Sequence, residues 1–424
     1  MLSINYLREN SKEAIERLKI KNFDASELIQ KVLDTDLERR QNQQERDAVL
    51  TELNNISKQI GMLFKNGKIE EANVAKEKTG ELKEKSKLLG QRAGEIDKEI
   101  LALLVEIPNI PNETVPPGKG EYDNVELNSF GEIPELHKGA LPHWELAKKY
   151  DIIDFELGNK LTGAGFPVYK GKGAKLQRAL INYFLDKAEE KGYKEVQPPI
   201  LVNEDSGFGT GQLPDKEGQM YHCQLDNFYL VPTAEVPVTN IFRDVILDAK
   251  DFPIQITAYT PCFRREAGSY GKDVRGLNRL HQFDKVEIVN VAHPDQSYKI
   301  LDEMVSYVES LVKELGLPYR ILKLCGGDIS FTSALTFDFE VYSAAQEKWL
   351  EVSSVSNFES FQANRLKLRF REEGEKKPKF AHTLNGSALA LPRIVAALLE
   401  NNQTEQGIEI PEVLQKYTGF SIID

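Results

Sequence analysis

A stretch without proline runs from Glu27 to about Leu104 and is rich in Glu, Lys, Gln, Arg and Leu. Residues of these types favour helix, and without proline a helix can continue for many turns. In both halves the apolar residues recur with a 4-3-4-3 spacing, which keeps one apolar stripe on one face of a slightly underwound helix. The stripes are Val49, Leu53, Ile56, Ile60 and Leu63 in the first half, and Leu89, Ala93, Ile96, Ile100 and Leu103 in the second.

A turn signal separates the two helical halves. The run KNGK, Lys65 to Lys68, contains Asn-Gly, which adopts left-handed turn geometry and lets the chain reverse. The sequence therefore predicts an antiparallel helical hairpin, an arm roughly 50 Å long at ~1.5 Å of rise per residue. The heptads alone favour a coiled-coil dimerisation element or a scaffold over a binding role. The interleaved Lys and Glu residues of the second helix are typical of a solvated face.

The composition of the chain predicts a globular protein that is acidic overall. Its 424 residues carry a formal net charge of −12 at pH 7, and this length predicts two domains. No run approaches the roughly 20 apolar residues of a membrane span, and the N-terminus lacks a signal-peptide pattern, so we expect a cytoplasmic protein without a membrane partner. Cys223, Cys262 and Cys325 are too few and too far apart for a disulfide framework or a CxxC metal site.

The region beyond the helices predicts an α+β domain. Proline and glycine make Glu106 to Asn124 typical of a linker. A helix is expected over Lys175 to Gly192, and then EVQPPILV, Glu195 to Val202, as a strand that a proline pair interrupts. Many short β runs with few helices between them favour an antiparallel sheet over a doubly wound parallel one. The runs are FYLVP, QITAYTPCFR, HQFDKVEIVNV, TFDFEVYSA and KWLEVSSVSNF.

The stretch FRREAGSYGKDVRGLNRLHQFDKVE, Phe263 to Glu287, concentrates arginine in this acidic chain. We predict a β-hairpin with a long tip, whose arginine forks match phosphate oxygens and whose glycines let the backbone approach a ligand. The predicted guest is a polyphosphate, and a solvated flexible hairpin is the alternative. Phe283 either covers a purine ring or belongs to the core. The arginines are Arg264, Arg265, Arg275 and Arg279, and the glycines are Gly268, Gly271 and Gly276.

Two further features carry charged or oxygen ligands. Glu351 and Ser354 lie three residues apart at a strand end, a spacing that suits Mg²⁺ shared with substrate phosphates. Arg393 lies near the start of an apolar helix, where its charge needs a partner. That partner is either a structural salt bridge or a phosphate.

Several motifs together resemble the bacterial-type seryl-tRNA synthetases, a family of class II aminoacyl-tRNA synthetases, and the match runs essentially end to end. The resemblance implies the class II antiparallel sheet flanked by helices, with an N-terminal helical-hairpin arm. It implies a tRNA-binding arm over residues 1–105, a linker over 106–125 and a catalytic domain over 126–424. The motifs are GTGQLP at 209–214, TAEVPVTN at 233–240, the loop at 263–287, EVSSVSN at 351–357 and TLNGSALALPR at 383–393.

The resemblance implies roles for individual residues at an ATP site. Arg264 would grip the α-phosphate and the serine carboxylate, Glu266 would contact the adenine amino group, and Phe283 would stack on the adenine. Arg393 would bind the γ-phosphate of a bent ATP. The implied catalytic residues are Arg264, Glu351 and Arg393, and the implied ATP site is Arg264, Arg265, Glu266, Phe283, Glu351, Val352, Ser353, Ser354 and Arg393.

The resemblance also implies the other ligands of the site. Mg²⁺ would be held by Glu351 and Ser354, and zinc is not expected. Serine would attack ATP through its own carboxylate, so that no side-chain nucleophile is required. Gly165 stands where many relatives carry an arginine, and we assign that position no substrate contact. The implied serine-binding residues are Thr233, Glu235, Arg264, Glu287 and Ser387.

The implied activity is that of a serine–tRNA ligase. Its arm would lie against the long variable arm of serine tRNA, and selenocysteine tRNA would also be a substrate. The segment GYKEVQPPIL, Gly192 to Leu201, resembles the family's dimer-interface motif and implies a homodimer, and the basic run Arg365 to Lys379 is a second candidate RNA patch. Two alternatives are a paralogue that activates an amino acid for a carrier protein, which would be expected to lack the arm, and an inactive RNA-binding relative, which should have lost Arg264, Glu287 or Glu351.

Overall fold

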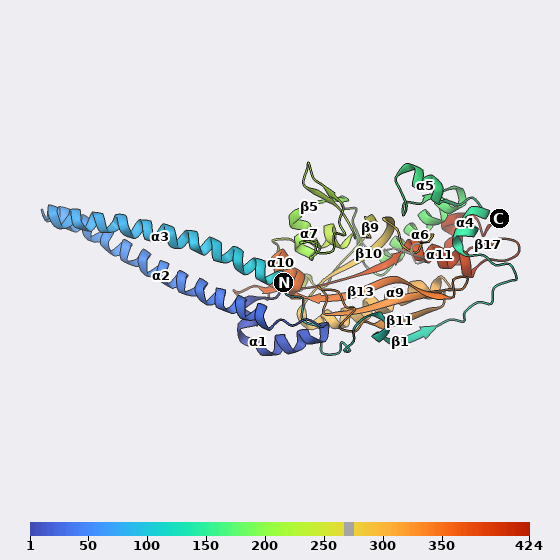
Figure 1. The fold of residues 1–424 in the computed structure, drawn as a ribbon, viewed down its shortest axis with the longest axis horizontal. Helices are drawn as coiled ribbons and strands as arrows, with labels where there is room; N and C mark the ends of the chain where they lie inside the picture. Colours follow the sequence, from blue (N-terminus) through green and yellow to red (C-terminus); the bar gives the residue numbers. More distant parts are fainter. Residues whose placement is uncertain (267–274) are drawn as a thin grey trace. The chain divides into compact units, whose positions relative to one another are not determined.

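The structure is a computed structural model that describes residues 1–266 and 275–424 and divides into two compact units (Figure 1). The first unit comprises residues 1–19 and 23–108, and the second comprises residues 20–22 and 109–424. Gly268 and Gly271, two of the glycines expected to admit a ligand, lie outside the described residues. Within the described part of the chain, no helix is long and apolar enough to cross a membrane.

The first unit contains the predicted antiparallel helical hairpin. The chain reverses at Asn66 to Lys68, where the Asn-Gly turn was expected. Val49 and Ile56 pack with Leu82 in a buried apolar cluster, which confirms that the heptad stripe holds the two long helices together. The helices of this unit are α1 (Ile4–Leu18), α2 (Ser26–Lys65) and α3 (Ile69–Leu104).

The second unit is built on an eight-stranded sheet in the order β1-β11-β12-β13-β16-β10-β9-β4. Its neighbouring strands are antiparallel except for β4 and β9, which confirms the predicted antiparallel sheet. Phe263 pairs with Gln282, so the arginine-rich stretch does join two paired strands. The strands are β1 (Val125–Phe130), β4 (Lys194–Glu195), β9 (Ile254–Phe263), β10 (Gln282–Ala292), β11 (Tyr319–Lys323), β12 (Leu335–Ser343), β13 (Lys348–Glu359) and β16 (His382–Ala390).

Three amphipathic helices pack on this sheet around one large apolar cluster. The cluster joins Phe184 of α6 and Leu311 of α9 to Phe339 of β12 and Leu384 of β16. Burial on this scale gives the sheet a rigid base, because closely packed interiors leave little room for side chains to move. The helices are α6 (Gly171–Glu190), which matches the helix expected over Lys175 to Gly192, α9 (Ser297–Glu314) and α11 (Leu391–Asn401).

The segment EVQPPILV forms two strands in different sheets. β4 ends before the prolines and pairs with β9, whereas β5 (Leu201–Asn203) begins after them and pairs with β7 (Phe228–Leu230) in a separate three-stranded sheet. Pro198 and Pro199 have no N–H to donate to a ladder, which accounts for the break. The predicted run FYLVP therefore lies outside the main sheet.

The segment expected to be a linker is anchored to the second unit from Asn109 onward. The backbone N–H of Asn109 donates to the carbonyl of Phe331 at 2.9 Å, and its side-chain amide donates to the carbonyls of Thr332 and Phe358, also at 2.9 Å. The N–H of Asn112 donates to the carbonyl of Ala334 at 2.7 Å. These bonds give the segment a fixed path.

Short elements complete the second unit. The helices are α4 (His143–Lys149), α5 (Phe155–Leu161), α7 (Glu204–Thr210), α8 (Glu235–Asn240), α10 (Ser360–Leu366) and α12 (Glu412–Thr418). The strands are β2 (Ile153–Asp154), β3 (Val168–Tyr169), β6 (His222–Cys223), β8 (Ile246–Asp248), β14 (Arg369–Arg371), β15 (Lys379–Phe380), β17 (Ile408–Glu409) and β18 (Ile422–Ile423).

Candidate active site

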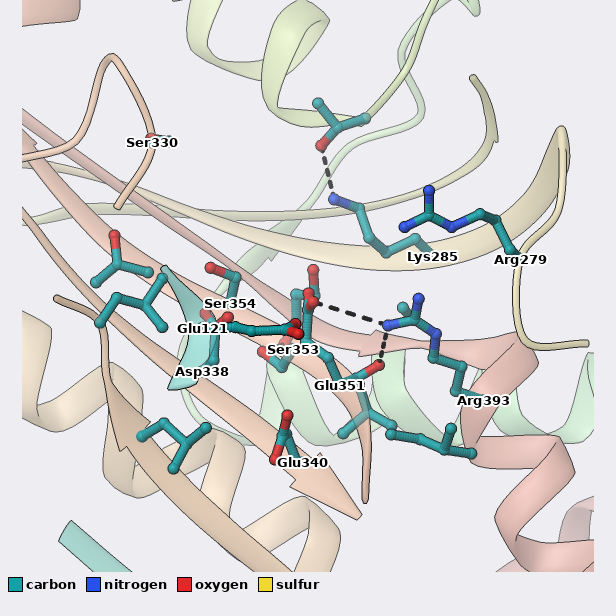
Figure 2. Close-up of a pocket in the computed structure, with 18 of the residues that line it drawn as sticks. Glu121, Arg279, Lys285, Ser330, Asp338, Glu340, Glu351, Ser353, Ser354 and Arg393 are labelled. Carbon is teal, nitrogen blue, oxygen red and sulfur yellow. Dashed lines mark hydrogen bonds and ion pairs between the residues drawn. The ribbon is translucent and has the colours of Figure 1, made fainter. Parts of the chain in front are cut away.

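A cavity of about 1370 Å³ opens over β10, β12, β13 and β16 and the start of α11 (Figure 2). It gathers nearly all of the residues that the sequence singled out. Arg265 is not among its described lining residues: the side chain is exposed, and the N–H donates to the carbonyl of Gln219 at 2.8 Å. The predicted residues that line the cavity are Thr233, Glu235, Arg264, Glu266, Arg279, Phe283, Glu287, Glu351, Val352, Ser353, Ser354, Ser387 and Arg393.

A buried polar triad forms one part of the cavity. The hydroxyl of Thr233 donates to a carboxylate oxygen of Glu287 at 2.9 Å and accepts from the ammonium of Lys285 at 2.8 Å. Lys285 also forms an ion pair with Glu287, and both side chains are almost fully buried. Lys285 was not predicted as a site residue, although it lies two residues from Glu287 and so faces the same side of β10. The triad presents charged and hydroxyl groups that suit a small zwitterionic ligand.

Glu235 is a second buried carboxylate beside this triad, at the start of α8. Burial raises the pKa of its carboxyl to about 7, the negative charge of Glu287 adds to the rise, and a hydrogen bond from Gln362 opposes it. The Gln362 amide donates to Glu235 at 2.6 Å and accepts from the hydroxyl of Thr383 at 2.7 Å. Gln362 was not predicted, and it fixes the orientation of the Glu235 carboxyl.

Replacing Glu235 with glutamine should make stability less sensitive to pH. Because the folded-state pKa of Glu235 lies above its unfolded value, its proton stabilises the fold in acid, and this contribution is lost as the pH rises towards about 7. Between pH 5 and 8, we expect the free energy of unfolding of Glu235→Gln to gain roughly 2 kcal/mol relative to the parent. Denaturant unfolding without ligands measures this, with the exposed Glu405→Gln as control. Parallel pH profiles for Glu235→Gln and the parent would contradict it.

The end of β9 brings an arginine to an aromatic ring. The guanidinium of Arg264 lies 5.3 Å from the centre of the Phe283 ring, and its Nε donates to the carbonyl of Pro232 at 3.3 Å. Phe283 both lines the cavity and packs against the main core, so the two alternatives for this ring are compatible. Glu266 has a positive φ of 48°, which is uncommon for a non-glycine residue, and its carboxylate pairs with Arg279 at 3.2 Å.

Arg393 reaches the cavity from the first turn of α11. Its Nε donates to the carbonyl of Asn278 at 2.9 Å, and its Nη1 donates to the carbonyl of Glu351 at 2.9 Å. The Glu351 carboxylate is 3.7 Å away. The salt bridge considered for this arginine therefore exists, and the guanidinium still lines the cavity, where a phosphate could reach it.

Oxygen ligands face one another across β12 and β13. Asp338 is opposite Ser354 and Glu340 is opposite Glu351 in the strand register. Burial, and then the charge of Glu351, raise the pKa of Asp338 well above its usual range. One Asp338 oxygen is buried and has no hydrogen-bond partner among the described residues. This Asp338 oxygen lies near the Glu351 carboxylate and the Ser354 hydroxyl. Such a set of oxygen atoms suits a hard cation such as Mg²⁺.

Gly165 has a structural reason to be glycine. Its φ is 81°, and a Cβ at this position would lie 2.4 Å from the imidazole of His281. The N–H of His281 donates to the carbonyl of Gly165 at 2.9 Å. Close approach of the two backbones leaves no room for a side chain at this position.

One residue of the expected RNA patch at Arg365 to Lys379 points inward, whereas Lys367, Arg371, Lys376, Lys377 and Lys379 are exposed and the patch stays a prediction. Arg365 is buried, and its Nη1 donates to the carbonyls of Phe208 at 3.2 Å and Leu213 at 2.9 Å. Burial lowers its pKa to about 10. Arg365 therefore holds α10 against α7 and the segment after it, and it is not part of a surface for RNA.

The cations of the hairpin are in part paired with carboxylates. Asp36 is fully buried and pairs with Arg8 at 3.2 Å, Arg39 at 2.6 Å and Arg40 at 3.2 Å, which ties α1 to α2. These pairs stabilise the first unit, and the three arginines keep a third to a half of their side-chain surface exposed. Ion pairs also link α2 with α3, at Glu52–Lys78, Glu45–Lys85 and Glu38–Arg92.

Comparison with known proteins finds related sequences and structures along the whole chain. Residues 1–111 match the family model "Seryl-tRNA synthetase N-terminal domain", and residues 221–402 match "tRNA synthetase class II core domain (G, H, P, S and T)". A serine–tRNA ligase from Salinibacter ruber is 52% identical over 100% of this chain and 99% of its own, and one from Geobacter sulfurreducens is 45% identical over 99% of each. The crystal structure of seryl-tRNA synthetase from Pyrococcus horikoshii complexed with ATP has a TM-score of 0.93 and 34% identity, covering 100% of this chain and 99% of that one. The cytoplasmic serine-tRNA ligase from Naegleria fowleri in complex with AMP has a TM-score of 0.87 and 26% identity over the same shares.

Proposed function

Because this chain belongs to the seryl-tRNA synthetase family and is a class II serine–tRNA ligase, we propose that the cavity over its sheet performs both steps of that reaction. It would activate L-serine with ATP, giving seryl-adenylate and pyrophosphate, and then transfer serine to the 3′ end of serine tRNA. The observation that carries the proposal is that the buried polar triad at Glu287 and the phosphate-matching arginines Arg264 and Arg393 line one cavity.

We assign serine to the end of the cavity around the buried carboxylates. Glu287 and Glu235 would accept hydrogen bonds from the ammonium or hydroxyl of the substrate, with Thr233 and Ser387 beside them, and Arg264 would bind the carboxylate. A site built around a hydroxyl rejects an analogue without it by roughly 10⁴-fold or more, because its buried polar groups are left unpaired. Alanine should therefore be excluded strongly. Threonine would be excluded by size, which is worth only ~1 to 3 kcal/mol.

We assign ATP to the end that carries the arginines. Phe283 would stack on adenine, Glu266 would accept from its amino group, and Arg264 would bind the α-phosphate. Arg393 would bind the γ-phosphate, since a planar fork matches phosphate oxygens. Val352, Ser353 and Ser354 would complete the site, and Arg265 would have to turn inward to join it.

Glu351 and Ser354 would hold Mg²⁺, with Asp338 beside them. When bound there with ATP, the ion would offset the negative charge of the phosphates. Among the described residues, no group of three or more His, Cys, Asp or Glu is arranged to hold a metal. The oxygen donors present suit Mg²⁺, which usually takes one or two protein carboxylates and completes its shell with water and substrate phosphates.

The proposed mechanism depends on positioning and charge. The serine carboxylate attacks the α-phosphorus in line and pyrophosphate leaves. The terminal ribose hydroxyl of tRNA then attacks the carbonyl of the adenylate, and AMP leaves. Arg264 would stabilise the charge that develops at the α-phosphate, and Arg393 would hold the departing pyrophosphate. Neither step uses a side-chain nucleophile.

A homodimer is the proposed assembly, in the cytoplasm, with the segment Gly192 to Leu201 at its interface. Ile200 and Leu201 are 38% and 44% exposed in the single chain. On the edge strand β1, Leu127 and Phe130 are 51% and 56% exposed. Large apolar side chains on such surfaces are commonly covered by a partner. A second copy is the partner that the family relationship supports.

We propose residues 1–105 as the arm that binds serine tRNA, with residues 106–125 joining it to the catalytic domain, residues 126–424. The arm would contact the shape and backbone of the long variable arm, since its exposed arginines suit phosphate. We propose that selenocysteine tRNA is charged in the same way.

Removing the variable arm from serine tRNA should strongly weaken charging and leave amino-acid activation intact. We expect kcat/KM for charging to fall by about 10²-fold, the equivalent of ~3 kcal/mol of lost backbone contacts. Aminoacylation with intact and truncated tRNA measures this. Equal charging of both tRNAs would contradict the role of the arm.

The experiment that tests the proposed activity is serine-dependent exchange of pyrophosphate into ATP by the purified protein. Threonine, alanine and a reaction without amino acid are the controls. Exchange with serine alone supports the site as assigned. Exchange with alanine at a comparable rate would overturn the assignment of the buried carboxylates to the serine hydroxyl and ammonium, and no exchange with any amino acid would overturn the activity.

A further inference from the structure

A buried hydrogen-bond network joins the start of α4 to the end of α11, and its central pair does not line the cavity. His143 and Glu400 have fully buried side chains, and the His143 Nδ1 lies 2.7 Å from a Glu400 carboxylate oxygen. The backbone N–H of His143 donates to the same oxygen at 2.9 Å. The hydroxyl of Ser343 donates to the other oxygen. A buried carboxylate needs several donors of this kind to remain in the interior.

The Nε2 of this imidazole holds the returning limb of the arginine-rich hairpin, which is the segment 275–281 that leads into β10. The N–H of Leu277 donates to the Nε2 of His143 at 2.8 Å. Since Nε2 accepts this bond, the proton of a neutral imidazole lies on Nδ1 and is donated to Glu400. Gly276 has a φ of 66°, and a Cβ there would lie 2.2 Å from the same Nε2. The limb therefore approaches the imidazole as closely as glycine permits.

The residue after Leu277 connects this limb to Arg393. The side chain of Asn278 donates to Gln346 at 2.8 Å, and the Gln346 amide donates to Glu400 at 3.0 Å. The carbonyl of Asn278 accepts from the Nε of Arg393 at 2.9 Å. Glu400 and Arg393 both lie on α11. The limb is therefore linked to this helix twice, directly at Arg393 and through Gln346 at Glu400.

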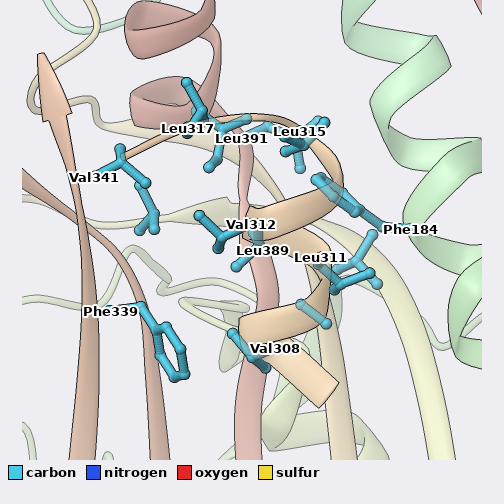
Figure 3. Close-up of a cluster of buried hydrophobic side chains, with 14 of the residues drawn as sticks. Phe184, Val308, Leu311, Val312, Leu315, Leu317, Phe339, Val341, Leu389 and Leu391 are labelled. Carbon is cyan, nitrogen blue, oxygen red and sulfur yellow. The ribbon is translucent and has the colours of Figure 1, made fainter. Parts of the chain in front are cut away.

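Helix α11 itself is a rigid support. Leu391 at its start and Leu389 at the end of β16 belong to the buried apolar cluster that also contains Phe339 and Val341 of β12 (Figure 3). Because packing fixes the helix, the Arg393 guanidinium can move mainly by rotation about the bonds of its own side chain. The Asn278 carbonyl restricts that freedom, and the position of this carbonyl depends on the limb.

We propose that His143 is a positioning residue for ATP. It touches no substrate. Through the Leu277 N–H it fixes the returning limb, so that the Asn278 carbonyl aims the Arg393 guanidinium into the cavity and Arg279 keeps its place beside Glu266. The inference rests on the proposed function, because it takes Arg393 to be a ligand of the ATP phosphates.

Two substitutions of His143 separate this role from a purely structural one. In His143→Asn, the amide nitrogen occupies the place of Nδ1 and can still donate to Glu400, but no acceptor remains for the Leu277 N–H. In His143→Gln, the amide oxygen occupies the place of Nε2 and can still accept from Leu277. We expect His143→Asn to raise the KM for ATP in serine-dependent exchange about tenfold, the scale of one lost hydrogen bond, and to leave the KM for serine unchanged. His143→Gln should remain within about threefold of the parent in the KM for ATP.

Gly276→Ala and His293→Asn complete the test. Gly276→Ala pushes the limb away from the imidazole, so it should raise the KM for ATP; it should also lower the melting temperature, because alanine is strained at a φ of 66° and its Cβ meets the His143 Nε2. It also provides a readout if both His143 variants fail to fold. His293 pairs with Glu372 at 2.9 Å and does not line the cavity, so His293→Asn should leave the KM for ATP unchanged.

The inference is overturned if His143→Asn and His143→Gln have the same KM for ATP, or if the KM for ATP of these variants changes only in proportion to their loss of melting temperature. It is also overturned if Gly276→Ala leaves the KM for ATP unchanged. Calorimetric titration of each variant with ATP separates this result from the proposed activity. If the parent exchanges no pyrophosphate, the proposed function fails, and the variants must still differ in Kd for ATP for the inference to stand.

Discussion

Replacing Arg264 with alanine should lower the rate of serine-dependent pyrophosphate exchange by at least ~10²-fold, the scale observed when one charge-stabilising donor is removed. Arg264 is the residue proposed to bind both substrates. It follows β9, lies over the Phe283 ring, and shares the cavity with Glu287. A group that binds both the serine carboxylate and the α-phosphate acts where charge develops, so the loss should fall mainly on kcat. Exchange kinetics at saturating serine and ATP measure it.

Lysine at position 264 provides the conservative comparison. A lysine keeps the charge but not the planar fork, so Arg264→Lys should recover only part of the lost rate. Arg178, an exposed arginine on α6, gives a matched control, and Arg178→Ala should exchange at the parental rate. If Arg264→Ala exchanged pyrophosphate as fast as the parent, the role assigned to Arg264 would be wrong.

The elements with a long repeating pattern were predictable from the sequence. The heptad stripe determines the helical hairpin because each apolar residue contacts its neighbour along the chain or on the next helix. The run HQFDKVEIVNV, rich in β-branched residues, likewise favours a strand and forms β10. Shorter elements were not predictable, since β5, β7 and their sheet depend on partners far away in the sequence. The strand β1 is exposed along its whole length, and its pairing with β11 comes from the tertiary structure.

The candidate site was predictable where a motif places its residues together. Asp338 and Gln362 were missed for a physical reason: each acts through a partner that the chain supplies from a different segment. Lys285 lies two residues from Glu287, and only its contact with Thr233 depends on a distant segment. Asp338 becomes notable only when β12 sets it opposite Ser354. Gln362 becomes notable only when α10 brings its amide to Glu235. Arg365 was expected at the surface and is buried. A basic run in the sequence does not reveal which of its cations point inward.

Replacing Glu287 with glutamine should have the second large effect. We expect kcat/KM for serine to fall ~10²-fold or more, with the KM for ATP nearly unchanged, because the buried group proposed to bind the substrate ammonium or hydroxyl loses its charge. The same change leaves the Lys285 ammonium without its ion-pair partner, at a site where the Glu287 side chain is only 2% exposed. Breaking a buried pair on one side typically costs about 3 kcal/mol of stability or more. Exchange kinetics and denaturant unfolding measure the two effects.

The double substitution Glu287→Gln with Lys285→Met separates recognition from stability. If the unpaired ammonium causes the loss of stability, removing it should restore most of the free energy of unfolding, because a buried pair can often be replaced by apolar or neutral groups at little cost. Serine activation should remain low, since nothing in the double variant replaces the carboxylate. Parental activation of serine by the folded double variant would show that Glu287 serves the fold and not the substrate. A double variant as unstable as Glu287→Gln would show that the destabilisation arises elsewhere, and Thr233 would be the next group to examine, because its hydroxyl contacts both members of the pair.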